Sequence, residues 1–107
     1  MRKGLMVLVF LMMVPVSSRT QTVEDLFNGG NDAYRSGKFQ EAVSAFESII
    51  QQGFVSPEVF FNLGNAYYRQ GMMARAILAY ERALRLAPGD PDIGHNLRLA
   101  NLRIVDR

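Results

Sequence analysis

The sequence contains no cysteine and no tryptophan, and His95 is its single histidine. Without cysteine the chain has no disulfide, no thiolate nucleophile and no sulfur-ligated zinc site. His95 stands in neither a Ser-His-Asp order nor a cluster with metal-ligand spacing. These absences argue against an enzyme, and we expect no catalytic residue, no metal site and no cofactor.

The sequence also lacks a large excess of either basic or acidic residues. The chain has 12 basic and 10 acidic residues, and without Arg2 and Lys3, which lie in a segment expected to be removed, the two counts are equal. A neutral chain without a basic run provides no long-range field for nucleic acid or anionic lipid. We therefore expect no nucleic-acid binding. The apolar share of 49% is that of a chain that folds into one domain.

The N-terminal segment has the order of a secretory signal. Two basic residues precede an almost unbroken apolar stretch over residues 5–16, and a pair of serines follows it. The stretch holds about a dozen residues, whereas a membrane-spanning helix needs roughly 20. We expect a signal peptide over 1–18, cleaved near Ser18 or after Thr20. The mature chain would then be exported, periplasmic or extracellular, without a membrane span.

The rest of the chain is a duplication with an offset of 34 residues. Many residues recur unchanged, and Phe46 is matched by the aromatic Tyr80. The recurring pairs include Phe27/Phe61, Asn28/Asn62, Gly30/Gly64, Asn31/Asn65, Tyr34/Tyr68, Arg35/Arg69, Gly37/Gly71 and Ala42/Ala76. We expect one repeat over 23–56 and a second over 57–90.

The apolar spacing within each repeat predicts two antiparallel helices joined by a turn. Gly37 and Gly71 stand where the first helix must end, because glycine accepts the left-handed conformation that closes a helix. The second helices are predicted over 39–52 and 73–86. Gly30 and its repeat equivalent allow the two helices of a pair to approach closely.

A fifth helix is predicted over 91–103. Asp90 is a suitable N-terminal cap, and Pro91 suits the first turn. Asp90 and Asp92 are paired carboxylates, as are Glu24 and Asp25, and acids at helix starts favour the positive end of the helix dipole. We interpret both pairs as caps and not as a catalytic acid and base. Residues 91–107 form either a capping helix or a partial third repeat.

The second repeat resembles the full tetratricopeptide signature. The residues that carry the resemblance are Phe60, Leu63, Gly64, Tyr67, Ala76, Tyr80, Ala83 and Pro88. The first repeat keeps Gly30, Ala42 and Phe46 but departs from the signature at other positions. The resemblance implies an all-α fold, an antiparallel helix-hairpin solenoid of two repeats with a C-terminal capping helix. It also implies that the protein binds another protein or peptide.

A narrower resemblance concerns the C-terminal part. Residues 84–88, 96–97, 100–103 and 105–106 are similar to those of the BatE-type tetratricopeptide proteins of Bacteroidetes, which are linked to aerotolerance gene clusters. Members of that family generally continue into membrane-spanning regions. Two interpretations stay open: a short relative, or the N-terminal piece of a longer membrane-associated protein.

The resemblance also indicates where a partner would bind. In tetratricopeptide arrays the first helix of each repeat lines the concave surface, and helical spacing identifies the residues on it. The candidates are Asn31, Tyr34, Arg35, Phe61, Asn65, Tyr68, Arg69 and Arg103, with Phe27, His95 and Leu99 beside them. Asparagine can bond both groups of a peptide backbone, and arginine offers a fork for a carboxylate. The alternative is that the phenylalanines cover the core and the arginines are solvated.

We therefore expect a scaffold or adaptor in the bacterial envelope. The chief alternative is a structural module that assembles with copies of itself. The last helix carries more apolar residues than the preceding pair can cover, namely Leu97, Leu99, Leu102, Ile104 and Val105. A homo-oligomer formed through this helix would bury them.

Overall fold

The computed structural model describes residue 4 and residues 21–105. Almost all of the predicted signal peptide, residues 1–18, lies outside this part of the chain. The described residues form α1 (Val23–Arg35), α2 (Phe39–Gln51), α3 (Pro57–Arg69), α4 (Met73–Leu86) and α5 (Pro91–Val105). No strand is present among them, and none of these helices is long and apolar enough to cross a membrane.

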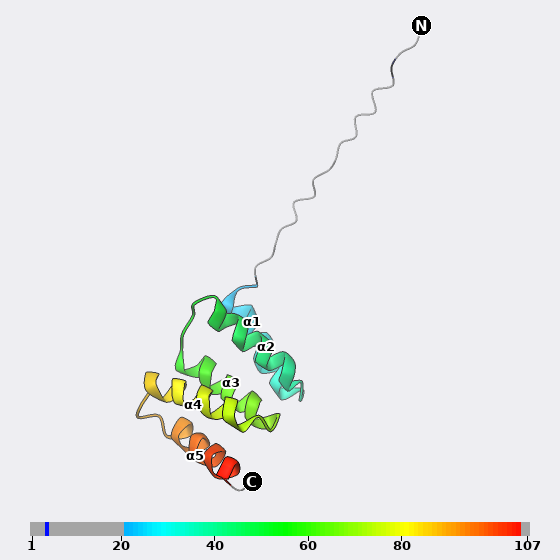
Figure 1. The fold of residues 1–107 in the computed structure, drawn as a ribbon. Helices are drawn as coiled ribbons and strands as arrows, with labels where there is room; N and C mark the ends of the chain where they lie inside the picture. Colours follow the sequence, from blue (N-terminus) through cyan, green and yellow to red (C-terminus); the bar gives the residue numbers. More distant parts are fainter. Residues whose placement is uncertain (1–3, 5–20, 106–107) are drawn as a thin grey trace.

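The helices pack in sequence order as layers (Figure 1). Helix α1 pairs with α2, and α3 pairs with α4, while α5 closes the stack against α4. Contacts between α2 and α3 join the two pairs. The arrangement confirms the predicted all-α fold, a helix-hairpin solenoid of two repeats with a C-terminal capping helix.

Local sequence signals set the helix ends. Gly37 and Gly71 both have φ of 77°, and the N–H of the residue after each donates to a carbonyl five residues earlier, at 2.8 and 2.9 Å. This left-handed closure is the predicted role of the two glycines. At the start of α5, Oδ1 of Asp90 accepts from the backbone N–H groups of Asp92 and Ile93 at 2.9 and 3.3 Å. The predicted cap is therefore confirmed.

Two predicted helix ends need correction. Helix α2 ends at Gln51, one residue early, and α5 continues past Arg103 to Val105. The longer α5 has a physical reason. Val105 stands where Gly37 and Gly71 end α1 and α3, and a β-branched residue does not favour a left-handed exit.

In each helix pair, a glycine of the first helix packs against an aromatic ring of the second helix. Gly30 of α1 lies against Phe46 of α2, and Gly64 of α3 lies against Tyr80 of α4. Both rings are almost fully buried. This contact confirms the predicted reason for small residues at these positions, which is a short distance between the helix axes.

Helices α1 and α3 each use one face to pack against the second helix of their pair, α2 or α4. Helix α5 carries different residues on the equivalent face. Arg98 occupies the position of Gly30 and Gly64, and Asn101 occupies that of Tyr67. Both polar residues are exposed. An arginine there would block the close approach of a further second helix, and a polar outer face is what a terminal cap presents to solvent.

Candidate functional site: a groove along the first helices

Two asparagine pairs connect the first helix of each layer to the next. Nδ2 of Asn62 donates to Oδ1 of Asn31 at 3.0 Å, joining α1 and α3. Nδ2 of Asn96 donates to Oδ1 of Asn65 at 3.0 Å, joining α3 and α5. The two pairs are related by the 34-residue repeat. Helix α5 therefore continues the row that α1 and α3 begin.

Arginine and aromatic side chains form a second periodic row. The guanidinium carbon of Arg69 lies 4.8 Å from the ring centroid of Phe39 and 5.9 Å from that of Tyr34. The guanidinium carbon of Arg103 lies 4.9 Å from the ring centroid of Tyr68. Each arginine thus lies over a tyrosine of the preceding layer, at a distance typical of cation–π attraction.

Two neighbouring pockets run along these rows. The larger, of about 230 Å³, is lined by Tyr34, Asn65, Tyr68, Arg69, Tyr80, Asn96 and Leu99. The smaller, of about 40 Å³, is lined by Asn31, Tyr34, Phe46, Asn62 and Asn65. Because Tyr34 and Asn65 line both, we treat the two pockets as one surface and call it the groove.

The asparagines of the groove keep hydrogen-bonding capacity. Oδ1 of Asn65 accepts from both the Tyr80 hydroxyl and Asn96, so its acceptor sites are occupied. Its Nδ2 has no partner among residues 21–105. Within residues 21–105 the side chain of Asn31 bonds only to Asn62, because Phe46 stands where Tyr80 stands in the second repeat. Amide groups of both residues are therefore available to a bound chain.

Burial changes the pKa of Tyr80. Its removal from solvent raises the pKa of the hydroxyl well above the ordinary value of 10.0. The hydroxyl, a neutral phenol at physiological pH like that of any ordinary tyrosine, donates a hydrogen bond to Oδ1 of Asn65. This bond fixes the Asn65 amide in the groove.

The structure brings most of the predicted site residues together. Those that line the groove are Asn31, Tyr34, Asn65, Tyr68 and Arg69. Arg103 lies beside it, over the Tyr68 ring.

Other candidate residues lie apart from the groove. Arg35 is exposed and pairs with Asp32 on its own helix at 3.4 Å. Phe61 packs against Tyr80 with ring centroids 5.9 Å apart, and Phe27 packs against Phe46 at 6.1 Å. The two phenylalanines therefore cover the core, as the alternative interpretation of the sequence expects. His95 lines neither pocket and is exposed, whereas Leu99 lines the larger pocket.

Sequence reasoning missed several residues of the groove. Asn62 and Asn96 could have been identified from the sequence, because with Asn28 they form a series of asparagines at the repeat spacing. Tyr80 is identified from the sequence only as the repeat equivalent of Phe46 and a residue of the signature, whereas in the structure its hydroxyl reaches Asn65. Phe39 lines neither pocket but lies under Arg69 of the groove, and the sequence did not indicate this contact because it crosses from one layer to the next.

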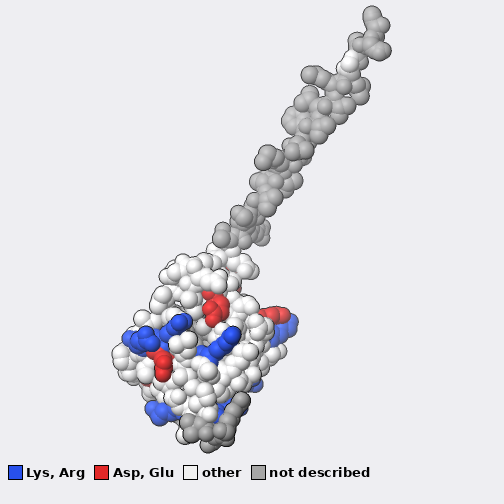
Figure 2. Space-filling model, viewed as in Figure 1, with Lys and Arg blue, Asp and Glu red and all other residues white. Residues whose placement is uncertain are grey.

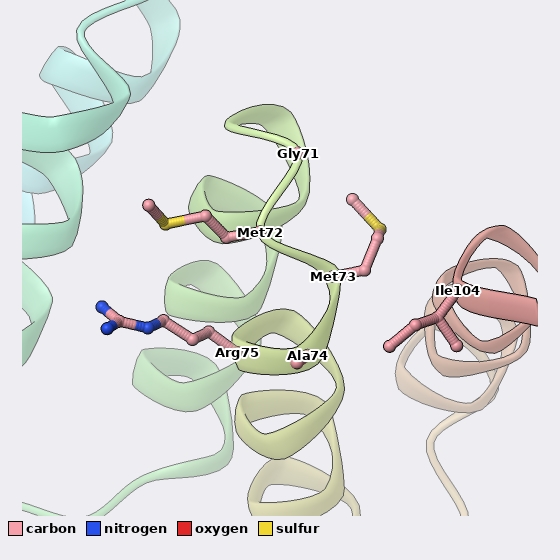
Figure 3. Close-up of a pocket in the computed structure, with 6 residues that line it drawn as sticks. All are labelled: Gly71, Met72, Met73, Ala74, Arg75 and Ile104. Atoms are coloured by element: carbon pink, nitrogen blue, oxygen red, sulfur yellow. The ribbon is translucent and has the colours of Figure 1, made fainter. Parts of the chain in front are cut away.

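A third pocket, of about 330 Å³, lies at the start of α4 (Figure 3). Met73 and Ile104 face each other across it, while Met72 and Arg75 extend to the other side of α4. Apolar groups dominate its wall, in contrast with the amides, phenols and guanidinium of the groove. We therefore place the candidate site in the groove.

The charged residues form no patch of one sign on the face shown in Figure 2, where basic and acidic side chains are interspersed. Within residues 21–105 no group of three or more histidines and carboxylates is placed to hold a metal ion. What the groove provides is hydrogen bonding, stacking and positive charge, which are means of binding.

The sequence was compared with protein families and with curated proteins. No curated protein matches it. The family model described as a tetratricopeptide repeat matches residues 27–91, which is more than half of the chain. Such repeats generally mediate protein–protein interaction and are generally non-catalytic. The chain belongs to the tetratricopeptide repeat family.

Proposed function

We propose that this protein is an adaptor of the bacterial envelope that holds a partner polypeptide in the groove. One observation carries the proposal. Five side chains predicted to bind a partner, from α1 and α3, line one continuous surface: Asn31, Tyr34, Asn65, Tyr68 and Arg69. Membership of a family that binds proteins supports the same conclusion.

The chemistry of the groove suits an extended chain. The amides of Asn31 and Asn65 can bond the carbonyl groups of a peptide backbone, which every sequence provides. Tyr34 and Tyr68 add flat apolar rings with polar tips. Backbone capture would supply affinity, and Arg69 would distinguish among partners by charge.

The envelope location rests on the sequence pattern of residues 1–18. We propose that this segment directs export and is then removed near Ser18. Cell fractionation followed by mass measurement of the N-terminus tests this step. Recovery of the uncleaved chain in the cytosol would overturn it. The narrower resemblance to BatE-type proteins stays a prediction.

The binding proposal is tested by crosslinking in envelope extract. The wild-type protein is compared with a groove variant, Asn31→Ala with Asn65→Ala, and with a control, Arg85→Ala, at an exposed position of α4 that does not line the groove. Circular dichroism checks that all three are helical. We expect the wild type and the control to capture the same protein and the groove variant to lose it. Equal capture by all three would refute binding through the groove.

Self-association is a second candidate, because α5 exposes apolar side chains. Leu102 is 62% exposed, Ile104 40% and Leu99 39%, whereas Leu97 packs partly against the core. The side chain of Val105 lies outside the described part of the structure. Sedimentation equilibrium of the wild type and of Leu102→Ser tests this candidate. A monomer at all concentrations would exclude it.

A further inference from the structure

We propose that copies of this protein associate head to tail, with Phe54 and Val55 of one copy bound in the apolar pocket between Met73 and Ile104 of the next. The inference goes beyond the proposed function, because neither surface belongs to the groove. Three features of the structure support it: an exposed apolar loop, a pocket that can receive it, and the opposite charge of the two edges on which they lie.

The loop between α2 and α3 exposes two adjacent apolar side chains. Phe54 and Val55 are each 57% exposed, and neither belongs to the hydrophobic core. Pro88 and Gly89 stand at the equivalent positions of the second repeat, so the repeat fold itself does not require large apolar side chains here. An exposed apolar pair of this kind is available for contact with another surface.

Hydrogen bonds fix this loop at both ends. The backbone N–H of Phe54 donates to the carbonyl of Ile49 at 3.3 Å, which closes the end of α2. At the other end, the N–H of Val59 donates to Oγ of Ser56 at 3.1 Å, which caps α3. A loop that is already tied down loses less conformational entropy when its side chains are buried in a complex.

The pocket at the start of α4 is a suitable receptor for these side chains. It has a volume of about 330 Å³, and Met73 and Ile104 face each other across it (Figure 3). This volume is at the lower end of the range of ligand pockets, and it is large enough for an aromatic ring. Ile104 is exposed, and so is Met72 beside the pocket. Methionine side chains adapt their shape to a bound apolar group.

The loop and the pocket lie at opposite edges of the molecule. The loops that join α2 to α3 and α4 to α5 lie at one edge, which we call the loop edge (Figure 1). The turns at Gly37 and Gly71 and the end of α5 lie at the other, the turn edge. Two copies therefore cannot make both contacts with each other. Repetition of such a heterologous contact gives an open chain or a larger ring.

The two edges carry mainly opposite charges. Helices α1, α3 and α5 run in the same direction, and each has acids in its first turn and an arginine in its last, as the helix dipole favours. The loop edge therefore gathers Glu24, Asp25, Glu58 and Asp92, and the turn edge gathers Arg35, Arg69 and Arg103. Helices α2 and α4 run back and contribute fewer charges of the opposite sense, Glu41 and Arg85. Contact between a loop edge and a turn edge is thus electrostatically favourable.

Sedimentation of the protein as recovered from cells, over a series of concentrations, tests the contact. We expect the wild type to form species larger than a dimer, and Phe54→Ser and Ile104→Lys each to weaken association by about tenfold or more. Leu78→Ser is the matched control, because Leu78 is 46% exposed on α4 and lines a different pocket. It should change the association by less than about twofold. Circular dichroism checks that all variants are helical.

A mixture of the two variants gives the sharpest result. Phe54→Ser keeps an intact pocket, and Ile104→Lys keeps an intact loop. An equimolar mixture should therefore form one contact and give a dimer of the two variants, although neither variant associates alone. Labelling one variant with a fluorophore identifies this dimer. Raising the salt from about 0.05 to about 0.5 M should weaken it, because screening removes the attraction between the edges.

Each contrary outcome overturns the inference and leaves groove binding intact. A wild type that is monomeric at every concentration, or a mixture that forms no dimer, would refute the contact between loop and pocket. An equal loss in Leu78→Ser would show general apolar association. Association that is lost in Leu102→Ser but kept in Phe54→Ser would assign it to the exposed face of α5. The groove variant, Asn31→Ala with Asn65→Ala, should associate as the wild type does.

Discussion

Gly64 lies so close to the ring of Tyr80 that a methyl group on Gly64 would stand 2.6 Å from Cδ1 and Cε1 of that ring. Heavy atoms cannot approach so closely, and the ring is buried and cannot easily move away. The same relationship recurs in the first repeat, where the added carbon on Gly30 would stand 2.7 Å from Phe46. These contacts fix how the two helices of each repeat pack.

Gly64→Ala should therefore destabilise the protein, although alanine has the higher helix propensity. Overpacking a buried contact costs about 1–3 kcal/mol, and urea unfolding measures it. Gly29→Ala is the matched control, because Gly29 is exposed on α1 and its added carbon meets nothing within 4 Å. It should stabilise the protein by up to about 1 kcal/mol. Stabilisation by both substitutions would contradict the packing described here.

Removal of the Tyr80 ring should have a larger effect. Tyr80→Ala leaves a cavity between α3 and α4 and should lower the free energy of unfolding by about 3–5 kcal/mol. Tyr80→Phe keeps the ring and removes only the hydroxyl that bonds Asn65, so about 0.5–1.5 kcal/mol is expected. Phenylalanine fits, since Phe46 stands at this position in the first repeat. A change within error for Tyr80→Ala would refute the repeat register.

Stability should decrease in alkaline solution. Burial raises the pKa of Tyr80 above 10.0, and burial together with the bond to the Glu47 carboxylate raises that of Tyr67. The folded protein then retains these protons at a pH where the unfolded chain releases them. The contribution of these two tyrosines to the free energy of unfolding is present in full below about pH 10. It is lost as the pH rises through their pKa values in the folded protein.

Urea unfolding at a series of pH values from neutral to strongly alkaline tests this direction. Other groups titrate in the same range, so the comparison is with Tyr80→Phe, which lacks the phenol. The free energy of unfolding of the variant should fall less steeply above pH 10. Identical slopes for the two proteins would show that Tyr80 does not contribute.

The cap of α5 gives a further prediction. Asp90→Ala removes the acceptor for the N–H groups of Asp92 and Ile93 and should destabilise the protein by about 0.5–2 kcal/mol. Asp90→Asn retains a capping oxygen and should cost only a few tenths of a kcal/mol, about the difference between good caps. Thermal unfolding followed by circular dichroism distinguishes the two. Equal loss would assign the effect to charge and not to the cap.

The repeat made much of this fold predictable. Gly37 and Gly71 ended their helices as expected, because a left-handed residue is a local requirement that few residues other than glycine meet. The small residues Gly30 and Gly64 were predictable for a similar reason, since only a short side chain permits close helix contact. The end of α5 was not predicted, because the pattern alone did not show that Val105 would remain helical.

The candidate site was predictable in part. Asn31 and Asn65 were identified by their place on the first helices, and both line the groove. Arg35 and Arg69 were equivalent in the sequence, yet one pairs with Asp32 and the other lies on aromatic rings. The difference arises because Arg35 belongs to the first layer, whereas Arg69 has a preceding layer to contact.

The sequence by itself determined the helices, their order and the tetratricopeptide class, because helix ends, periodicity and small residues act within one or two turns of chain. Only the tertiary structure decided which polar groups meet. The bonds of Asn31 with Asn62 and of Tyr80 with Asn65, and the cation–π contact of Arg69 with Phe39, cross between helices. Such contacts depend on the distance and rotation between packed helices, which side-chain volumes set together and no single residue encodes.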